Sequence, residues 1–163
     1  MGVCGCGKST IARALAHACN GVFLDADDFH PPANIEKMMR GEPLDDADRA
    51  PWLATLASQI FDPKHAHQAI FLACSALKAS YRDILTAGHT HVHFVHLTGP
   101  PELIRARLRA RSDHFMPDTL IDSQFATLEV PDDAFSIDIN SSVESIVTTI
   151  QQRFYEKNFS CGN

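Results

Sequence analysis

A glycine-rich segment at the start of the chain has the residue types and spacing of a phosphate-binding loop. Residues 2–10 match the pattern G-x-x-x-x-G-K-[ST]. Glycines let the backbone curl around an anion with its N–H groups pointing inward, and the helix expected next adds the positive end of its dipole. Lys8 is expected to reach the β- and γ-phosphates of ATP, and the Ser9 hydroxyl to ligate Mg²⁺. The expected ATP-binding residues of this segment are Gly2, Val3, Cys4, Gly5, Cys6, Gly7, Lys8, Ser9 and Thr10.

Two carboxylates follow the first predicted strand, residues 22–24. In an extended chain, Asp25 and Asp27 point to the same side. One could face Mg²⁺ and its waters while the other orients a substrate hydroxyl for in-line attack on a phosphate. The alternative is that these acidic residues end a strand and cap a helix. Their place after a phosphate loop favours the catalytic interpretation.

Other nucleotide-binding classes lack support in the sequence. Neither Asp-x-x-Gly nor Asn-Lys-x-Asp occurs, which argues against a GTPase. The most apolar strand, residues 69–74, ends without an aspartate, so the strand-end metal carboxylate of many ATPases is missing there. A small-molecule kinase remains as the favoured class.

Four arginines alternate near the end of a predicted helix. They are Arg105, Arg107, Arg109 and Arg111. Residues two apart do not share a helix face, whereas Arg107 and Arg111 are spaced i,i+4 and do. A cation closing over the γ-phosphate would stabilise charge during phosphoryl transfer. A solvated basic helix end, favoured by the helix dipole, explains the other two arginines.

The predicted elements alternate between short strands and amphipathic helices. Apolar runs with β-branched or aromatic residues predict strands at residues 22–24, 69–74, 92–97 and 135–139. Helical periodicity predicts helices at residues 9–19, 48–61, 101–111 and 142–155. This alternation predicts an α/β fold with a mainly parallel sheet. Two polar segments break it, and we expect them to carry a substrate-binding insertion, about residues 29–61, and a lid, about residues 112–133.

The composition predicts one globular domain over residues 1–163, because 45% of the residues are hydrophobic and 21% are charged. A net charge of −6 argues against a broad nucleic-acid interface. No apolar run approaches the length of a membrane helix, so no membrane partner is expected. The five cysteines come without a secretory signal, which predicts reduced thiols in a cytoplasmic protein.

Beyond the phosphate loop, motifs along nearly the whole chain resemble those of the thermoresistant gluconokinase family, P-loop kinases of the shikimate-kinase-like type. They include Asp25-Ala-Asp-Asp-Phe-His-Pro31 and Ser123-Gln-Phe-x-Thr-Leu-Glu129. The matching segments are residues 1–9, 25–31, 34–38, 41–46, 48–53, 73–78, 81–85, 113–117 and 123–129. The resemblance implies a three-layer P-loop fold like that of adenylate and shikimate kinases. It also implies ATP- and Mg²⁺-dependent phosphorylation of D-gluconate at its primary hydroxyl, giving 6-phospho-D-gluconate.

The same resemblance implies roles on the nucleotide side. Asp27 resembles the carboxylate that contacts the acceptor hydroxyl, and Asp25 resembles the one nearer the metal, which Ser9 also ligates. Arg111 resembles a lid arginine and joins Lys8 and Asp27 in the expected catalytic set. A further residue, Arg107, resembles one that packs near the adenine.

On the substrate side, Arg49, Lys78 and Arg82 resemble the family's polar positions. Cations there suit a sugar acid, which is an anion. His30 is a candidate for contacting the polyol hydroxyls. Two other functions stay open: another small-molecule kinase of this fold, acting on shikimate or a nucleoside monophosphate, and a non-catalytic relative that only binds ATP. The oligomeric state also stays open, with a homodimer as one option.

The chain departs from the family pattern at its start. Cys4 and Cys6 stand where the family usually has serine, and the electropositive loop is expected to make either thiol reactive. Only Met1 precedes the loop, whereas the family has a strand there, lying between the strands expected at residues 69–74 and 92–97. We therefore expect the natural product to begin upstream of Met1 with a short apolar segment.

Overall fold

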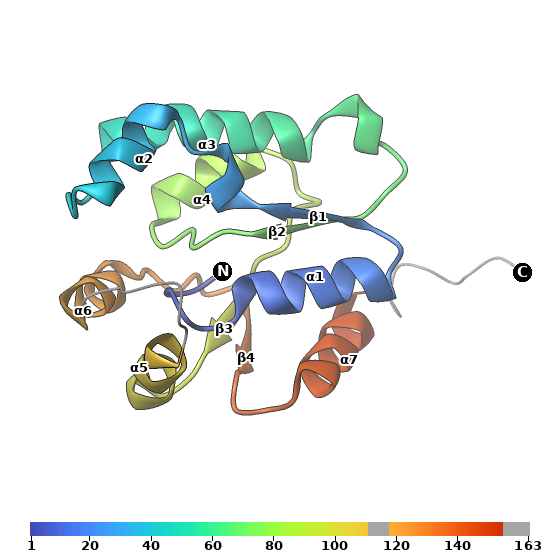
Figure 1. The fold of residues 1–163 in the computed structure, drawn as a ribbon. Helices are drawn as coiled ribbons and strands as arrows, with labels where there is room; N and C mark the ends of the chain where they lie inside the picture. Colours follow the sequence, from blue (N-terminus) through green and yellow to red (C-terminus); the bar gives the residue numbers. More distant parts are fainter. Residues whose placement is uncertain (111–117, 155–163) are drawn as a thin grey trace, which may run out of the picture.

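The computed structural model describes residues 1–110 and 118–154. Within them the order of elements is that of an α/β protein, with helices alternating with short strands (Figure 1). The helices are α1 (Lys8–Ala18), α2 (Pro32–Met39), α3 (Asp46–Ile60), α4 (Ala79–Thr86), α5 (Pro101–Arg109), α6 (Asp118–Thr127) and α7 (Val143–Phe154). The strands are β1 (Val22–Asp25), β2 (Ile70–Ala73), β3 (Val95–Thr98) and β4 (Phe135–Asp138), and two short 3₁₀ turns are η1 (Ala26–Phe29) and η2 (Pro63–His65).

The strands form two parallel pairs, β1 with β2 and β3 with β4. The predicted parallel arrangement is therefore confirmed, but the described strands do not join into one continuous sheet. The first two residues lie between the pairs. The Met1 carbonyl accepts a 3.0 Å hydrogen bond from the Leu97 N–H in β3, and the Gly2 N–H donates one of 3.1 Å to the Ser75 carbonyl just after β2.

Helices cover both faces of the β1–β2 pair. Helices α3 and α4 lie on one face, and α1 lies on the other, between the pair and α7 (Figure 1). Helix α1 buries an apolar stripe against its neighbours, as its sequence predicts. That stripe consists of Ile11, Ala12, Leu15 and Ala16. The phosphate-loop helix is thus held at the centre of the molecule.

Two hydrophobic cores stabilise the two parts of the fold. One core lies among α1, α5, α7 and the β3–β4 pair. The other lies between α3, α4 and the end of β2, and its buried residues include Trp52, Leu53, Leu56, Tyr81 and Leu85. Among residues 1–110 and 118–154, no helix combines the length and apolar composition that crossing a bilayer requires.

Helix α3 begins two residues earlier than its predicted start at Asp48. The side chain of Asp45 accepts a 2.9 Å hydrogen bond from the Asp48 N–H, and the Asp48 carboxylate accepts one of 2.8 Å from the Asp45 N–H. This reciprocal capping box satisfies backbone donors that the helix start leaves unpaired. As a result, Pro51 lies inside the helix and not in its first turn, where the sequence pattern placed it.

The structure contains three helices that the sequence analysis did not predict. Helix α2 falls in the first polar segment and α6 in the second, while α4 follows β2 directly. Helices α2 and α4 have only eight residues each. They are too short to show a clear helical repeat of apolar residues, so the sequence did not predict them. The predicted lid at residues 112–133 lies partly outside the described residues, and its described part contains α6.

Candidate active site

The phosphate loop is held in shape by backbone conformations that favour glycine. Gly2 has a φ of 134°, and a Cβ on it would lie 2.7 Å from the Leu97 carbonyl oxygen. Gly5 has a φ of 83°, and a Cβ there would lie 2.5 Å from a carbon of the Leu108 side chain. The loop is therefore packed closely against β3 and α5. Helix α1 starts at Lys8, so the loop ends at a helix N-terminus, the arrangement that binds phosphate.

Lys8 folds back over the loop from the start of α1. Its ammonium group donates a 3.0 Å hydrogen bond to the Val3 carbonyl. Val3 itself is buried in the first core. The ammonium group of the predicted phosphate-binding lysine thus lies against the backbone of the loop, where a triphosphate would replace or share this contact.

Ser9 and Asp25 are brought together at the loop. The Ser9 hydroxyl donates a 2.8 Å hydrogen bond to Oδ2 of Asp25, although the two residues lie in α1 and at the end of β1. A hydroxyl oxygen beside a carboxylate oxygen is a donor set that suits Mg²⁺, which prefers hard oxygen ligands. The predicted pair of metal-side residues therefore fits that ion.

Asp27 does not lie on an extended strand with Asp25, as its spacing suggested. Residues Ala26–Phe29 form the 3₁₀ turn η1, because the Asp25 side chain accepts a hydrogen bond from the Asp27 N–H at 3.3 Å and ends the strand. Asp25 is thus both a cap and a partner of Ser9. The Asp27 side chain is exposed at the edge of the loop region.

His30 is stacked in a site next to Asp27. Its ring lies parallel to Trp52 with centroids 4.3 Å apart, and the Trp52 indole donates a 2.8 Å hydrogen bond to the Ala26 carbonyl. Within the described residues, Nδ1 of His30 is buried and has no hydrogen-bond partner. Burial lowers the pKa of His30, with Arg49 acting in the same direction and Asp27 opposing it. A neutral imidazole with an unused nitrogen is suited to a substrate hydroxyl.

Lys78 belongs to a network that sequence reasoning missed. Both carboxylate oxygens of Asp46 lie 2.8 Å from its ammonium group, and the Tyr81 hydroxyl also donates to Asp46. The hydrogen bonds from Lys78 and then Tyr81 lower the pKa of Asp46, and the bond to Asp46 raises the pKa of Lys78. Arg49 joins this network, donating to the Leu44 carbonyl and lying 3.5 Å from the Tyr81 hydroxyl.

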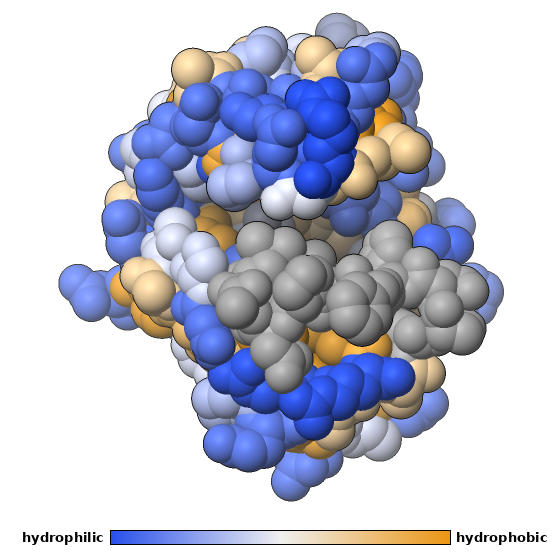
Figure 2. Space-filling model, turned by 60° about the vertical axis from the view of Figure 1, so that its left-hand side comes forward, coloured by the Kyte–Doolittle hydropathy of each residue, from blue (hydrophilic) through white to orange (hydrophobic). Residues whose placement is uncertain are grey.

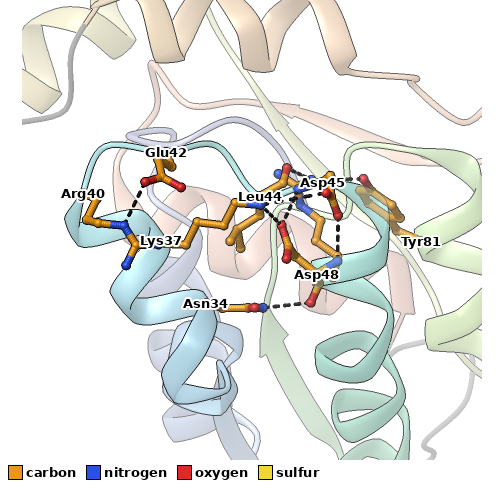
Figure 3. Close-up of polar contacts among 9 residues, drawn as sticks. Asn34, Lys37, Arg40, Glu42, Leu44, Asp45, Asp48 and Tyr81 are labelled. Atoms are coloured by element: carbon orange, nitrogen blue, oxygen red, sulfur yellow. Dashed lines mark hydrogen bonds and ion pairs between the residues drawn. The ribbon is translucent and has the colours of Figure 1, made fainter.

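Helices α2 and α3 are tied together beside this network (Figure 3). The Lys37 ammonium lies 2.5 Å from Oδ2 of Asp48, and the Asn34 amide donates a 2.9 Å hydrogen bond to the Asp48 carbonyl. Asn34 is buried, although it is polar. The bond from Lys37 lowers the pKa of Asp48. These contacts hold the first turn of α3, and with it Arg49, in place.

Arg82 and Arg107 make backbone contacts. Arg82 is buried and donates to the Ala76 and Leu77 carbonyls at 3.0 and 3.2 Å, which supports the loop between β2 and α4. Arg107 donates a 2.7 Å hydrogen bond to the Ile139 carbonyl. It also lines a cavity of about 330 Å³ beside the phosphate loop, together with Gly5, Gly7, Thr10 and Val143. Arg111, the expected lid arginine, lies outside the described residues.

The two loop cysteines differ in accessibility. Cys6 is 1% exposed and packs in the first core, so the expectation that its thiol is open to reagents is wrong. Cys4 is half-buried, and its backbone N–H donates a 2.7 Å hydrogen bond to Oε1 of Gln124 in α6. Sequence reasoning gave Gln124 no role, and no local pattern connects residues 120 positions apart.

The surface over α2 and α3 carries both polar and apolar side chains, since Ile35, Met38 and Met39 of α2 are exposed. On the face drawn in Figure 2, hydrophilic residues gather over the upper part of the molecule, where Figure 1 places these two helices.

Comparison with known proteins finds similar kinases over most of the chain. The family described as AAA domain matches residues 1–131. The chain is 41% identical over 153 residues to the thermoresistant gluconokinase of Escherichia coli (strain K12), covering 91% of this chain and 87% of that protein. It is 47% identical over 133 residues to the gluconokinase of Gluconobacter oxydans (strain 621H), covering 82% and 75%. The crystal structure of a gluconokinase from Sinorhizobium meliloti 1021 superposes with a TM-score of 0.81 at 35% identity, covering 98% of this chain and 95% of that one.

Proposed function

The chain belongs to the gluconokinase family of P-loop kinases, and on that premise we propose that it transfers the γ-phosphoryl group of ATP to the primary hydroxyl of D-gluconate, giving 6-phospho-D-gluconate. The observation that supports the proposal is the hydrogen bond between Ser9 and Asp25, which brings two oxygen donors suited to Mg²⁺ together at the phosphate loop. The stacked His30 and the cationic side chains on the acceptor side add to it.

On the nucleotide side, the loop N–H groups and the start of α1 would hold the phosphates, with Lys8 placed over the γ-phosphate. Ser9 and Asp25 would hold Mg²⁺ directly or through its waters, and the ion would neutralise charge that develops between the β- and γ-phosphates. The cavity lined by Arg107 and Thr10 would take the nucleoside.

On the acceptor side, Asp27 would accept a hydrogen bond from the primary hydroxyl and turn its oxygen toward the γ-phosphorus. Arg49 and Lys78 would draw the carboxylate of the sugar acid, which is the group that sets it apart from a neutral sugar. The buried Arg82 would support the loop that carries Lys78, through its hydrogen bonds to the Ala76 and Leu77 carbonyls. His30 would contact a hydroxyl along the chain of the substrate, since its Nδ1 has no partner within the described residues. Asp46 holds the Lys78 ammonium in place.

An ADP-release assay across acceptors tests this function. D-gluconate, other aldonates, shikimate and nucleoside monophosphates are compared at equal concentration with ATP and Mg²⁺. We expect turnover with D-gluconate to exceed that with shikimate or a nucleoside monophosphate by orders of magnitude. A preference for either of those two acceptors would replace the proposed function. ATP binding without turnover on any acceptor would indicate a non-catalytic relative. We also propose a cytoplasmic location, where ATP is available and where cysteine thiols such as those of Cys6, Cys19 and Cys74 stay reduced.

A further inference from the structure

One short segment contacts both halves of the site. It runs from Gln124 in α6 to Glu129, and we refer to residues 124–129 as the bridging segment. At one end, Oε1 of Gln124 accepts a 2.7 Å hydrogen bond from the Cys4 N–H in the phosphate loop. At the other end, Oε2 of Glu129 accepts a 2.6 Å hydrogen bond from the Ala79 N–H at the start of α4. The two contacts join parts of the chain that are 120 and 50 residues away.

The contact with Gln124 holds the peptide of Cys4 in the phosphate loop. The neighbouring Val3 carbonyl accepts from Lys8, and Gly5 is packed on Leu108. Gln124 therefore determines the direction of the one N–H between these two anchors. Because phosphate binding depends on loop N–H groups that already point at the anion, the orientation of this peptide affects nucleotide affinity.

The contact with Ala79 fixes the loop that carries Lys78. The Glu129 N–H also donates a 2.8 Å hydrogen bond to the Leu77 carbonyl, so Glu129 holds the residues on both sides of Lys78. Arg82 donates to the same Leu77 carbonyl from α4. The carboxylate lies at the positive end of α4, where a negative charge is favoured. Glu129 thus places Lys78 relative to Asp46.

The bridging segment is itself anchored in the first core. Ile121, one turn before Gln124, is 1% exposed, and Phe125 and Leu128 pack against the same core. Both polar contacts therefore start from a rigid base, which lets a single hydrogen bond orient its partner.

We propose that Gln124 and Glu129 are positioning residues for the two substrates: Gln124 orients the phosphate loop for ATP through the Cys4 amide, and Glu129 orients Lys78 for the sugar acid through the start of α4. The proposal rests on the proposed function for its acceptor half only. It predicts that loss of each contact changes affinity for one substrate and leaves affinity for the other unchanged.

The test uses the whole chain with Gln124→Met and Glu129→Met, which keep the side-chain length and remove the acceptor. Losing one hydrogen bond of ordinary strength corresponds to about a three- to tenfold effect. We expect Gln124→Met to weaken binding of a non-hydrolysable ATP analogue, and to raise KM for ATP, by that factor, with KM for gluconate within twofold of wild type. We expect Glu129→Met to raise KM for gluconate by the same factor, with KM for ATP within twofold of wild type. Glu129→Gln, which keeps an acceptor for the Ala79 N–H, should restore KM for gluconate.

Matched controls separate positioning from a general loss of stability. Gln59 accepts a hydrogen bond from Lys64 on an exposed part of α3, and Glu144 lies in the first turn of α7. Gln59→Met and Glu144→Gln should leave both KM values unchanged. Gln124→Asn, which withdraws the acceptor by one methylene, serves as a second variant if Gln124→Met does not fold.

Two outcomes would overturn the proposal. The first is a lower melting temperature in both variants with both KM values unchanged, which would mean that the contacts only stabilise the fold. The second is an equal rise of both KM values in each variant. A wild-type protein that binds the ATP analogue but does not phosphorylate gluconate would contradict the proposed function instead, and analogue binding by Gln124→Met would still test the role of Gln124.

Discussion

The nucleotide side and the acceptor side of the site are built by different means. We expect the phosphate loop to bind ATP through backbone N–H groups, and glycines stand at its two closest contacts, Gly2 and Gly5. The acceptor side uses side chains from η1, α3 and α4, and its cations are already paired, as Lys78 is with Asp46. A backbone site is specified by a short local sequence. A side-chain site depends on how distant helices are held together, here by contacts such as that of Lys37 with Asp48.

This comparison predicts that the largest loss of activity comes from the nucleotide side. Lys8→Ala should reduce kcat by at least about 100- to 1,000-fold, because its charge acts on the γ-phosphate in the transition state. The fold should survive, since the variant loses only the hydrogen bond to the Val3 carbonyl, about 1 kcal/mol. Steady-state kinetics and a thermal melt measure both quantities. Near-normal turnover would contradict the assignment of the phosphate loop.

Replacing the carboxylates of Asp25 and Asp27 with amides, one at a time, tests the nucleotide side and the acceptor side separately. Asp27→Asn should lower kcat with gluconate by about 100-fold or more and leave ATP-analogue binding unchanged, because the proposed partner of Asp27 is the acceptor hydroxyl. Asp25→Asn should shift activity toward higher Mg²⁺ concentrations, because Asp25 accepts from Ser9 in the metal-side pair.

Velocity is measured for both variants against gluconate and against Mg²⁺. Asp28→Asn, next to Asp27 in η1, is the matched control and should resemble wild type. The same profile for Asp25→Asn and Asp27→Asn would mean that the two residues share one role.

The paired charges of the acceptor side should appear as an acid-dependent stability. The pKa of Asp46 is lowered in the folded protein by its hydrogen bonds to Lys78 and Tyr81. The contribution of this carboxylate is therefore fully present above the ordinary aspartate pKa of about 3.9, and it is lost as the pH falls through the lower folded value.

Urea unfolding of wild type and Asp46→Asn between pH 7 and pH 3 measures this contribution. The variant should have the lower midpoint at pH 7, and the difference should shrink toward pH 3. The other carboxylates titrate in the same way in both proteins, so their contributions cancel in the difference between the two midpoints. A difference that stays constant over this range would show that the pairing of Asp46 does not depend on its charge.

The smallest expected effect on activity comes from alkylation of the thiols in the phosphate loop. Alkylation should occur at Cys4 and not at the buried Cys6, and it should slow turnover because the adduct lies at the phosphate loop. Saturating ATP should protect the enzyme. Cys4→Ser should stay active and become resistant to the reagent. Peptide mapping of the alkylated protein identifies the site, and modification of Cys6 at the same rate would contradict the packing described here.

The same contrast explains how much of the molecule could be predicted. The phosphate loop, the four strands and helices α1, α5 and α7 were predictable, because each has a local pattern in a contiguous segment. The true start of α3 was not, since its capping box has aspartate in place of the usual Ser/Thr and Glu. Gln124 and Asp46 act on residues 120 and 32 positions away, and no spacing rule reveals such contacts.

The most direct test of the account follows the phosphoryl group itself. The protein is incubated with ATP, Mg²⁺ and D-gluconate, and ³¹P NMR monitors the reaction, with Lys8→Ala in parallel. We predict that a phosphate monoester on the primary carbon of gluconate appears in step with ADP, one for one, and that both form at least about 100-fold more slowly with Lys8→Ala. ADP formed at the same rate without gluconate, or an ester at another position, would contradict the account.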